Sequence, residues 1–336
     1  MAKREMKYKI IGNDDIRAQL RIAITSARAR NVAPPHILFA GAAGCGKTTT
    51  ARLMAEALGT KFLQGHPDSL KSYKDLKPLI GQFSLVGYTE QGERVGPVSP
   101  TILFLDEIHN LPLKGQEMLG IAMENFIMPM PTQNQEFVRW IPQFTLIGAT
   151  TDEGKLAKPF RDRFKLRFIF TVYNLEETIE IIKYHASKLE KIEHISSEAI
   201  TEIAMRSRGV PRIMVGLLER CRDTAVALKR NKIEKWTALQ TFKMMEVNTE
   251  GLGRSDINLL KALFAINKPV GQQNLSVILN ESPDNILNSL EPFLIQQGLM
   301  LRGPRGRELT NSGIKYLSEK GYIDKMEAMK VLIERS

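Results

Sequence analysis

The chain has 336 residues, of which 43% are hydrophobic and 25% charged, and its formal net charge is +10. A chain of this length and composition is expected to bury a sizeable core in two or three domains, so the chain as a whole is not a disordered tail. The apolar runs are shorter than the eighteen or so residues of a bilayer span, and the first ten residues lack the apolar segment of a signal peptide, so we expect a cytoplasmic protein.

The excess of positive charge favours an anionic partner, and nucleic acid is the usual one. Most of the excess lies before residue 174, and a merely soluble basic surface is the alternative. The two cysteines, Cys45 and Cys221, have neither metal-ligand spacing nor a disulfide framework, which fits a reducing compartment.

The first motif along the chain is a strand followed by a glycine-rich loop. Residues 36–40, HILFA, predict the strand, and residues 41–50, GAAGCGKTTT, satisfy the pattern G-x-x-x-x-G-K-[ST]. Glycines let backbone N–H groups approach a phosphate chain, and the helix that follows adds its positive end. We therefore expect Lys47 to reach the β- and γ-phosphates of a nucleotide and Thr48 to hold Mg²⁺.

Two further predicted strands end in polar residues, as strands of a parallel α/β sheet do where their ligands bind. Residues 101–107, TILFLDE, end in Asp106 and Glu107, and residues 144–150, FTLIGAT, end in Thr150. Asp106 is placed to hold the metal through water and Glu107 to orient the attacking water. Thr150 is within plausible reach of the γ-phosphate, although a strand-end threonine taken alone is usually structural.

The segment PFRDRF carries Arg161 and Arg163 around Asp162. In isolation, a surface ion-pair cluster explains it better. The order of acids, polar strand end and arginines is nevertheless that of ATPases whose neighbouring subunit supplies an arginine in trans.

After Tyr173 the sequence predicts amphipathic helices and no further strands of the core. Residues 175–190, 196–208 and 212–230 have helical periodicity, and Ser196 and Ser197 are candidate caps of the second helix. These segments predict a helical second domain.

The glycine-containing stretch 248–256 marks the next boundary, and three helix-like stretches follow it. Two short strand candidates then flank the turn GPRG, which predicts a β-hairpin wing after three helices. A wing of this kind places Arg302, Arg305 and Arg307 together and suits them to phosphate oxygens. A solvated hairpin is the alternative.

Taken together, these motifs resemble the RuvB family, hexameric AAA+ motors that drive Holliday-junction branch migration. The matching stretches, in the family's order, are GKTT, DEIH, FTLIGATT, RDRF, RSRGVPRI, LEPFLIQQG and RGPRGR. The resemblance implies an α/β AAA+ ATPase core over 1–174, an all-α lid over 175–250 and a winged helix over 251–336. It also implies ATP and Mg²⁺ as cofactors, and double-stranded or four-way-junction DNA, a homo-hexamer and a RuvA-like adaptor as partners.

The resemblance further implies roles for single residues. Asp106 and Glu107 serve hydrolysis, Thr150 senses the γ-phosphate, and Arg163, with Arg161 beside it, is the finger that acts on the adjacent subunit. The implied nucleotide-binding residues are Ile10, Ile11, Gly41, Gly44, Gly46, Lys47, Thr48, Thr49, Tyr173 and Arg212. Core packing explains Ile10 and Ile11 equally well.

Two segments differ from the family. Residues 81–100 are longer than expected between these elements and are interpreted as a mobile loop, and residues 126–143, where the family contacts RuvA, have an unusual sequence. The second difference leaves open whether a RuvA-like adaptor is used, and it suits a viral or mobile-element version. The alternative functions are a clamp-loader or helicase-loader ATPase and a winged-helix regulator that uses ATP only to assemble.

Overall fold

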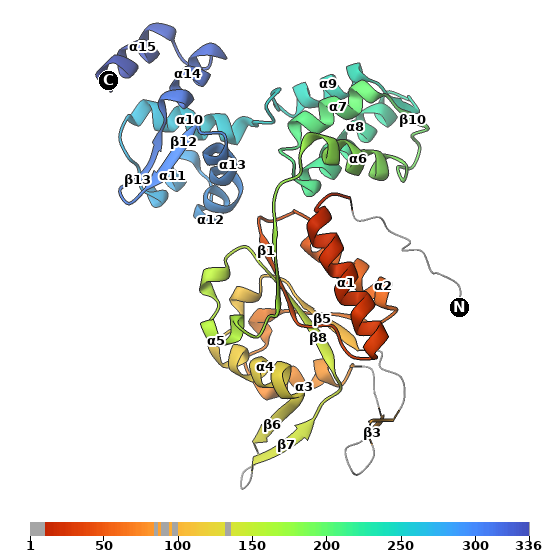
Figure 1. Cartoon of the computed structure of the whole chain (residues 1–336). Coiled ribbons are helices and arrows are strands. Elements are labelled where there is room, and N and C mark those ends of the chain that lie inside the picture. The colour runs from red at the N-terminus through yellow and green to blue at the C-terminus, as the bar shows by residue number, and fades with distance from the viewer. Residues whose placement is uncertain (1–10, 84–86, 89–93, 96–99, 132–135, 336) are drawn as a thin grey trace. The chain divides into compact units, whose positions relative to one another are not determined.

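The computed structural model describes residues 11–83, 87–88, 94–95, 100–131 and 136–335 (Figure 1). The chain forms two compact units: unit 1 is Met1–Ile181 with Val210–Arg212, and unit 2 is Ile182–Gly209 with Ile213–Ser336. None of the helices in these described ranges is long and apolar enough to cross a membrane. The domain boundaries expected near residues 174 and 250 remain predictions.

Unit 1 is built on a five-stranded parallel sheet in the order β2-β5-β8-β1-β9. Its strands are β1 (Ile37–Gly41), β2 (Phe62–Gly65), β5 (Thr101–Leu105), β8 (Phe144–Thr150) and β9 (Leu166–Phe170). The three strands expected from the sequence are confirmed with shifts of at most two residues at their ends. The central strands β5 and β8 are buried along their whole length, as a sheet covered on both faces requires.

Helices cover both faces of this sheet (Figure 1). One face packs on α1 (Asp14–Arg30) and α2 (Lys47–Leu58) through a core that includes Ile37, Phe39 and Phe104. The other face packs on the remaining helices through Leu38, Leu103 and Leu146. These helices are α3 (Tyr73–Ile80), α4 (Leu113–Asn125) and α5 (Lys158–Arg161). Alternate residues of β1, β5 and β8 thus enter separate cores.

The strand register brings the polar strand ends together. In the β1–β8 pair Ala40 lies opposite Thr150, and in the β5–β8 pair Leu105 lies opposite Gly148. The glycine-rich loop after β1 and the acidic pair after β5 therefore leave the sheet at the same edge, where ligands of parallel sheets bind.

The described residues of unit 1 also form two short hairpins and three 3₁₀ turns. The hairpins pair β3 (Gly87–Tyr88) with β4 (Arg94–Val95) and β6 (Ile127–Pro131) with β7 (Glu136–Trp140). The turns are η1 (Pro67–Ser69), η2 (Ile108–Asn110) and η3 (Glu153–Lys155). Most of the predicted mobile loop at 81–100 lies outside the described residues.

Helices dominate the lid segment, as expected. It contains α6 (Leu175–Ala186), α7 (Ser197–Arg206), α8 (Pro211–Ala227) and α9 (Lys235–Met244). Ser196 caps α7, since its hydroxyl accepts a hydrogen bond from the Ala199 N–H at 3.2 Å. The segment also holds a two-residue parallel pair, β10 (His194–Ile195) and β11 (Lys232–Ile233), which the sequence did not predict.

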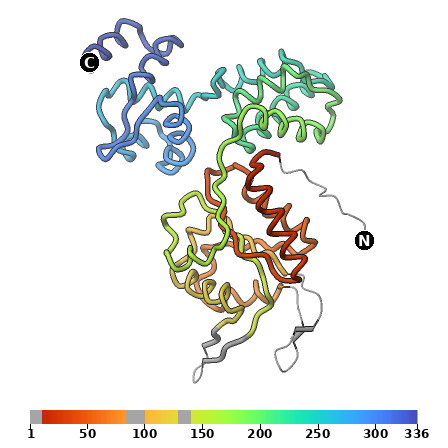
Figure 2. The backbone as a smooth tube through the Cα atoms, in the orientation of Figure 1, coloured from red at the N-terminus to blue at the C-terminus, as the bar shows by residue number. Residues whose placement is uncertain are grey.

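The last part of unit 2 has three helical stretches, the third formed by α12, η4 and α13 in succession, then the expected hairpin and two more helices, and Figure 2 shows its backbone trace. Its elements are α10 (Arg254–Ile266), α11 (Gln272–Leu279), α12 (Pro283–Asn285), the π-helical turn η4 (Ile286–Leu290), α13 (Glu291–Gln296), β12 (Met300–Gly303), β13 (Gly306–Leu309), α14 (Asn311–Glu319) and α15 (Lys325–Glu334). Leu259, Leu275 and Leu294 of the three helices share one core with Leu309 of the hairpin.

Candidate nucleotide site and DNA-binding wing

The glycine-rich loop presents the start of α2 as an anion site. The loop ends at Gly46, whose φ is 92°, and α2 begins at Lys47 with no capping side chain on its first-turn N–H groups. Lys47 donates from Nζ to the carbonyls of Gly41 at 2.7 Å and Ala42 at 2.9 Å. Gly41 has a φ of 134°, and a Cβ there would lie 2.2 Å from the Phe170 carbonyl oxygen, so only glycine fits.

The electrostatics of Lys47 connect the predicted residues of this site. Burial lowers the pKa of Lys47, the Glu107 and Asp106 carboxylates act in the opposite direction, and Arg212 adds to the lowering. These groups therefore share one electrostatic environment, in which a buried ammonium gains from an anionic ligand. Thr48 is half-buried in the first turn of α2, and Thr49 beside it is exposed.

Cys45 belongs to the core beneath the loop. Its side chain is fully buried in the cluster that joins α1, α2 and the sheet, and burial raises the pKa of its thiol. A buried thiol with a raised pKa is a poor nucleophile, which favours packing over redox sensing.

The acidic pair follows β5 directly. Asp106 is half-buried and accepts a hydrogen bond from the Glu107 N–H at 3.1 Å. Glu107 has a φ of 46°, a left-handed conformation that is rare for a residue with a side chain and common at functional sites. Its Oε2 accepts hydrogen bonds from the Thr151 N–H at 3.2 Å and the Thr151 hydroxyl at 3.0 Å.

Thr150 and Thr151 have different environments. Thr150 is fully buried, and its hydroxyl lies 2.9 Å from His109 Nδ1 and accepts from the Asp152 N–H at 3.0 Å. Thr151 is exposed and contacts Glu107, and His109 Nδ1 also lies 3.2 Å from Glu107 Oε2. The structure thus adds Thr151 and His109, which sequence reasoning missed, although both belong to the quoted stretches GATT and DEIH.

The residues predicted to border the adenine come from two segments, one near residue 11 and one at Tyr173. Ile10 lies outside the described residues, and Ile11 is half-buried. A Cβ at Gly12 would lie 2.8 Å from ring carbons of Tyr173, so the two residues touch. Burial raises the pKa of Tyr173, whose hydroxyl donates to the Cys45 carbonyl at 3.3 Å.

Arg212 lies against the glycine-rich loop. It is the second residue of α8, after Pro211, and belongs to unit 1. A Cβ at Gly44 would lie 3.1 Å from Arg212 Cβ and 3.0 Å from Val210 Cγ1. The structure therefore brings Arg212 and Gly44 together.

Arg161 and Arg163 are held in ion pairs at the end of α5. Arg163 lies 3.1 Å from a Glu124 carboxylate oxygen and donates to the Pro159 carbonyl at 2.6 Å. Arg161 Nε lies 3.9 Å from a Glu153 carboxylate oxygen. The surface-cluster interpretation thus describes the contacts within one copy of the chain.

The hairpin wing presents two arginines and buries the third. Arg302 is 54% exposed and lies 3.9 Å from a Glu291 carboxylate oxygen, and Arg305 is exposed on the turn. Arg307 is only 8% exposed and donates from Nε to Glu291 at 2.6 Å. The prediction of three phosphate-facing cations is therefore wrong for Arg307, because its guanidinium is paired with the buried carboxylate of Glu291.

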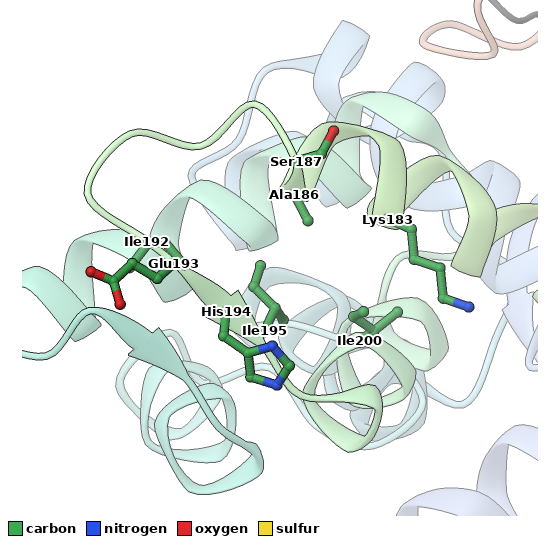
Figure 3. Close-up of a pocket in the computed structure, with 8 residues that line it drawn as sticks. All are labelled: Lys183, Ala186, Ser187, Ile192, Glu193, His194, Ile195 and Ile200. Carbon is green, nitrogen blue, oxygen red and sulfur yellow. The ribbon is translucent and has the colours of Figure 1, made fainter.

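A pocket of about 220 Å³ lies in the lid part of unit 2 (Figure 3). It is lined by Lys183, Ala186, Ser187, Ile192, Glu193, His194, Ile195 and Ile200. None of the predicted site residues lines it.

Comparison with known proteins covers nearly the whole chain. The profile described as "Holliday junction DNA helicase RuvB P-loop domain" matches residues 3–170, the RuvB AAA lid domain matches 173–248, and the RuvB C-terminal winged helix domain matches 249–318. Since all three are RuvB domains in the expected order, the loader and regulator alternatives are not favoured.

Curated relatives and solved structures agree with these profiles. The "Holliday junction branch migration complex subunit RuvB" of Ehrlichia ruminantium is 34% identical over 318 residues, which is 94% of this chain and 91% of the relative. The protein of the same name from Pediococcus pentosaceus is 34% identical over 324 residues, 94% of this chain and 90% of the relative. The "Thermotoga maritima RuvB Holliday junction branch migration motor" superposes with a TM-score of 0.76 at 33% identity, covering 91% of this chain and 95% of that one. The chain therefore belongs to the RuvB family of Holliday junction DNA helicases.

Proposed function

We propose that this RuvB-family ATPase works as a ring of identical subunits that converts ATP hydrolysis at each subunit junction into movement of DNA. The chain is an ATP-dependent motor of the RuvB type that drives Holliday-junction branch migration. The observation that carries the hydrolysis site of this proposal is the contact between Glu107 and Thr151, at the sheet edge from which the glycine-rich loop leaves.

Lys47 and the first-turn N–H groups of α2 bind the nucleotide phosphates, with Arg212 adding a second cation against the loop. The Thr48 hydroxyl and the Asp106 carboxylate supply oxygen ligands only, which fits Mg²⁺, a cation that prefers oxygen. When bound, Mg²⁺ would neutralise charge on the phosphates. Tyr173 and Ile11 border the adenine.

Glu107 orients the water that attacks the γ-phosphate. Its left-handed backbone and its two hydrogen bonds from Thr151 fix the carboxylate at the sheet edge. His109 lies within 3.2 Å of the same carboxylate oxygen and limits its rotation further. We assign to Thr151, instead of the buried Thr150, the polar contact that responds to the γ-phosphate.

Arg163 acts on the nucleotide of the adjacent subunit, with Arg161 beside it. Within its own chain Arg163 is held by Glu124 and by the Pro159 carbonyl, so its guanidinium is ordered before a neighbour arrives. An arginine supplied in trans requires an oligomer, and the family resemblance favours a hexamer.

DNA binds to the wing through Arg302 and Arg305, whose exposed cations suit phosphates without regard to sequence. The hairpin formed by β6 and β7 is the proposed contact for a RuvA-like adaptor, because it lies in the segment 126–143, where the family resemblance places that contact. The curated relatives are named as subunits of a branch migration complex. A cytoplasmic location belongs to the same proposal.

ATP-driven branch migration on a synthetic four-way junction tests these roles. We expect Glu107→Gln to bind ATP but to lose hydrolysis and migration, and Arg163→Ala to lose both while each subunit still binds ATP. Arg167→Ala is the matched control, because Arg167 belongs to the same cluster, pairs with Glu153 and Asp162, and has no assigned role. Normal migration by either of the first two variants would refute the assigned roles.

A further inference from the structure

The turn between α7 and α8, in the lid, lies close along the chain both to a residue that contacts the nucleotide loop and to a residue that contacts the winged-helix domain. Arg208 and Gly209 have consecutive left-handed conformations, with φ of 57° and 66°. Four residues after Arg208 comes Arg212, which lies against the nucleotide loop. The Arg208 side chain, by contrast, makes its contacts with residues beyond 250.

Arg208 is bound to the winged-helix domain by three kinds of contact. Its Nε and Nη2 donate to the Gly251 carbonyl at 2.9 and 2.8 Å, and its guanidinium pairs with the Asp256 carboxylate in the first turn of α10. The guanidinium carbon also lies 4.4 Å from the centre of the Phe293 ring of α13. Asp256 is 3% exposed, so removal of Arg208 would leave a buried carboxylate without its counter-ion.

The segment 248–252, beside this arginine, makes further contacts within unit 2. The Asn248 side chain accepts hydrogen bonds from the Glu250 N–H at 3.1 Å and the Leu252 N–H at 2.9 Å, and donates to the Tyr316 hydroxyl at 2.7 Å. A Cβ at Gly251 would lie 2.6 Å from the Arg206 carbonyl oxygen, so the backbone of this segment packs directly on the end of α7. The glycines expected to make a domain boundary here therefore allow close packing.

Arg206, two residues earlier, has the same set of interactions confined to the lid. It donates to the Glu202 carboxylate at 2.5 Å and the Glu202 carbonyl at 3.0 Å, and it lies 4.7 Å from the centre of the Phe242 ring of α9. The chain thus offers two arginines of similar chemistry, the buried Arg206 and the half-buried Arg208, of which only Arg208 contacts the winged-helix domain through these groups.

We propose that Arg208 is a positioning residue that fastens the winged-helix domain to the end of lid helix α7, so that the two move as one body during the ATPase cycle. The inference rests on the proposed function, in which nucleotide contact at Arg212 moves the lid. A hinge at this point would let the lid move without displacing the DNA. The hydrogen bonds from Arg208 to Gly251 and Asp256 prevent such a hinge motion, so that movement of the lid also displaces the DNA.

A distance measurement on the full chain tests the fastening directly. Spin labels at Glu219→Cys in α8 and Lys325→Cys in α15 are accessible, whereas the native cysteines are buried. We expect one narrow distance distribution in the labelled protein, a clearly broader one with Arg208→Gln, and a narrow one with the control Arg206→Gln. An unchanged distribution with Arg208→Gln, or equal broadening with both variants, would overturn the proposal.

Activity supplies a second readout. For Arg208→Gln we expect ATP hydrolysis and DNA binding within about twofold of the parent but about tenfold less branch migration per ATP hydrolysed. Arg208→Lys should recover part of the migration because it keeps a cation beside Asp256. Normal migration per ATP by Arg208→Gln would overturn the proposal. If the parent protein itself does not migrate junctions, the proposed function fails, and the distance measurement alone decides the role of Arg208.

Discussion

His36, the residue before β1, is a buried histidine that joins β8 and α4 to the strand leading into the nucleotide loop. Its Nδ1 accepts a hydrogen bond from the Leu146 N–H at 2.9 Å, so Nε2 carries the proton of the neutral ring and donates to the Met123 carbonyl at 3.0 Å. Burial lowers the pKa of His36 from 6.5 to about 4, the bond to Met123 opposes the shift, and Lys165 adds to it. We therefore predict that mild acid destabilises unit 1.

The sign and size of the effect follow from linkage. The folded-state pKa of His36 lies below the unfolded value, so the unfolded chain binds the proton first as the pH falls. The stability contributed by the neutral ring is fully present above pH 6.5, declines between pH 6.5 and 4, and is lost below. A shift of this size corresponds to about 3 kcal/mol in total, of which about 2 kcal/mol is lost at pH 5.

Urea unfolding of the full chain at pH 7 and pH 5 measures this loss. In a Trp236→Phe background Trp140 is the single tryptophan and reports on unit 1. His36→Gln keeps a donor and an acceptor but does not titrate, so its free energy of unfolding should change about 2 kcal/mol less than that of the parent. His185→Gln is the control, because burial also lowers the pKa of His185 but that residue lies in unit 2. Equal pH dependence in His36→Gln and the parent would refute the reasoning.

Three further predictions follow from the site. Thr151→Val should lower ATP hydrolysis by about tenfold or more with ATP binding retained, whereas Thr150→Val should mainly lower stability; the reverse ranking in a steady-state ATPase assay would contradict the assignment. Arg305→Ala should reduce the salt dependence of DNA binding by about one phosphate contact, while Arg307→Ala should leave it unchanged and cost about 3–5 kcal/mol of unfolding free energy. Cys45 should react slowly with a thiol reagent in the native chain because burial raises its pKa, and rapid labelling would count against this.

Local pattern was sufficient to predict the nucleotide-binding edge of the fold. Strands β1, β5 and β8 are short apolar runs that end in polar residues, and such runs have few alternatives to a buried parallel sheet. The Ser196 cap and the wing hairpin could also be predicted from the sequence, because capping and turn chemistry act over three or four residues. The pair β10–β11 could not be predicted, since two-residue strands show no periodicity in the sequence.

The choice between Thr150 and Thr151 depends on the pleat of β8. Successive side chains of a strand point to opposite faces, so only one of two adjacent threonines can meet the acid at the end of β5. The stretch GATT predicts a polar strand end but does not show which threonine ends the strand. The structure ends β8 at Thr150, buries that side chain beside His109 and leaves Thr151 to contact Glu107.

The pairing of charges on the wing depends on tertiary contacts, so it cannot be predicted from the local sequence of the hairpin. Arg302 and Arg307 lie directly opposite each other on β12 and β13, where two like charges repel. Glu291, at the start of α13 and 1% exposed, resolves the repulsion by binding Arg307 at 2.6 Å and lying 3.9 Å from Arg302. A buried carboxylate on a separate helix thus turns one of three candidate DNA contacts into an internal counter-ion, and it leaves Arg302 and Arg305 exposed.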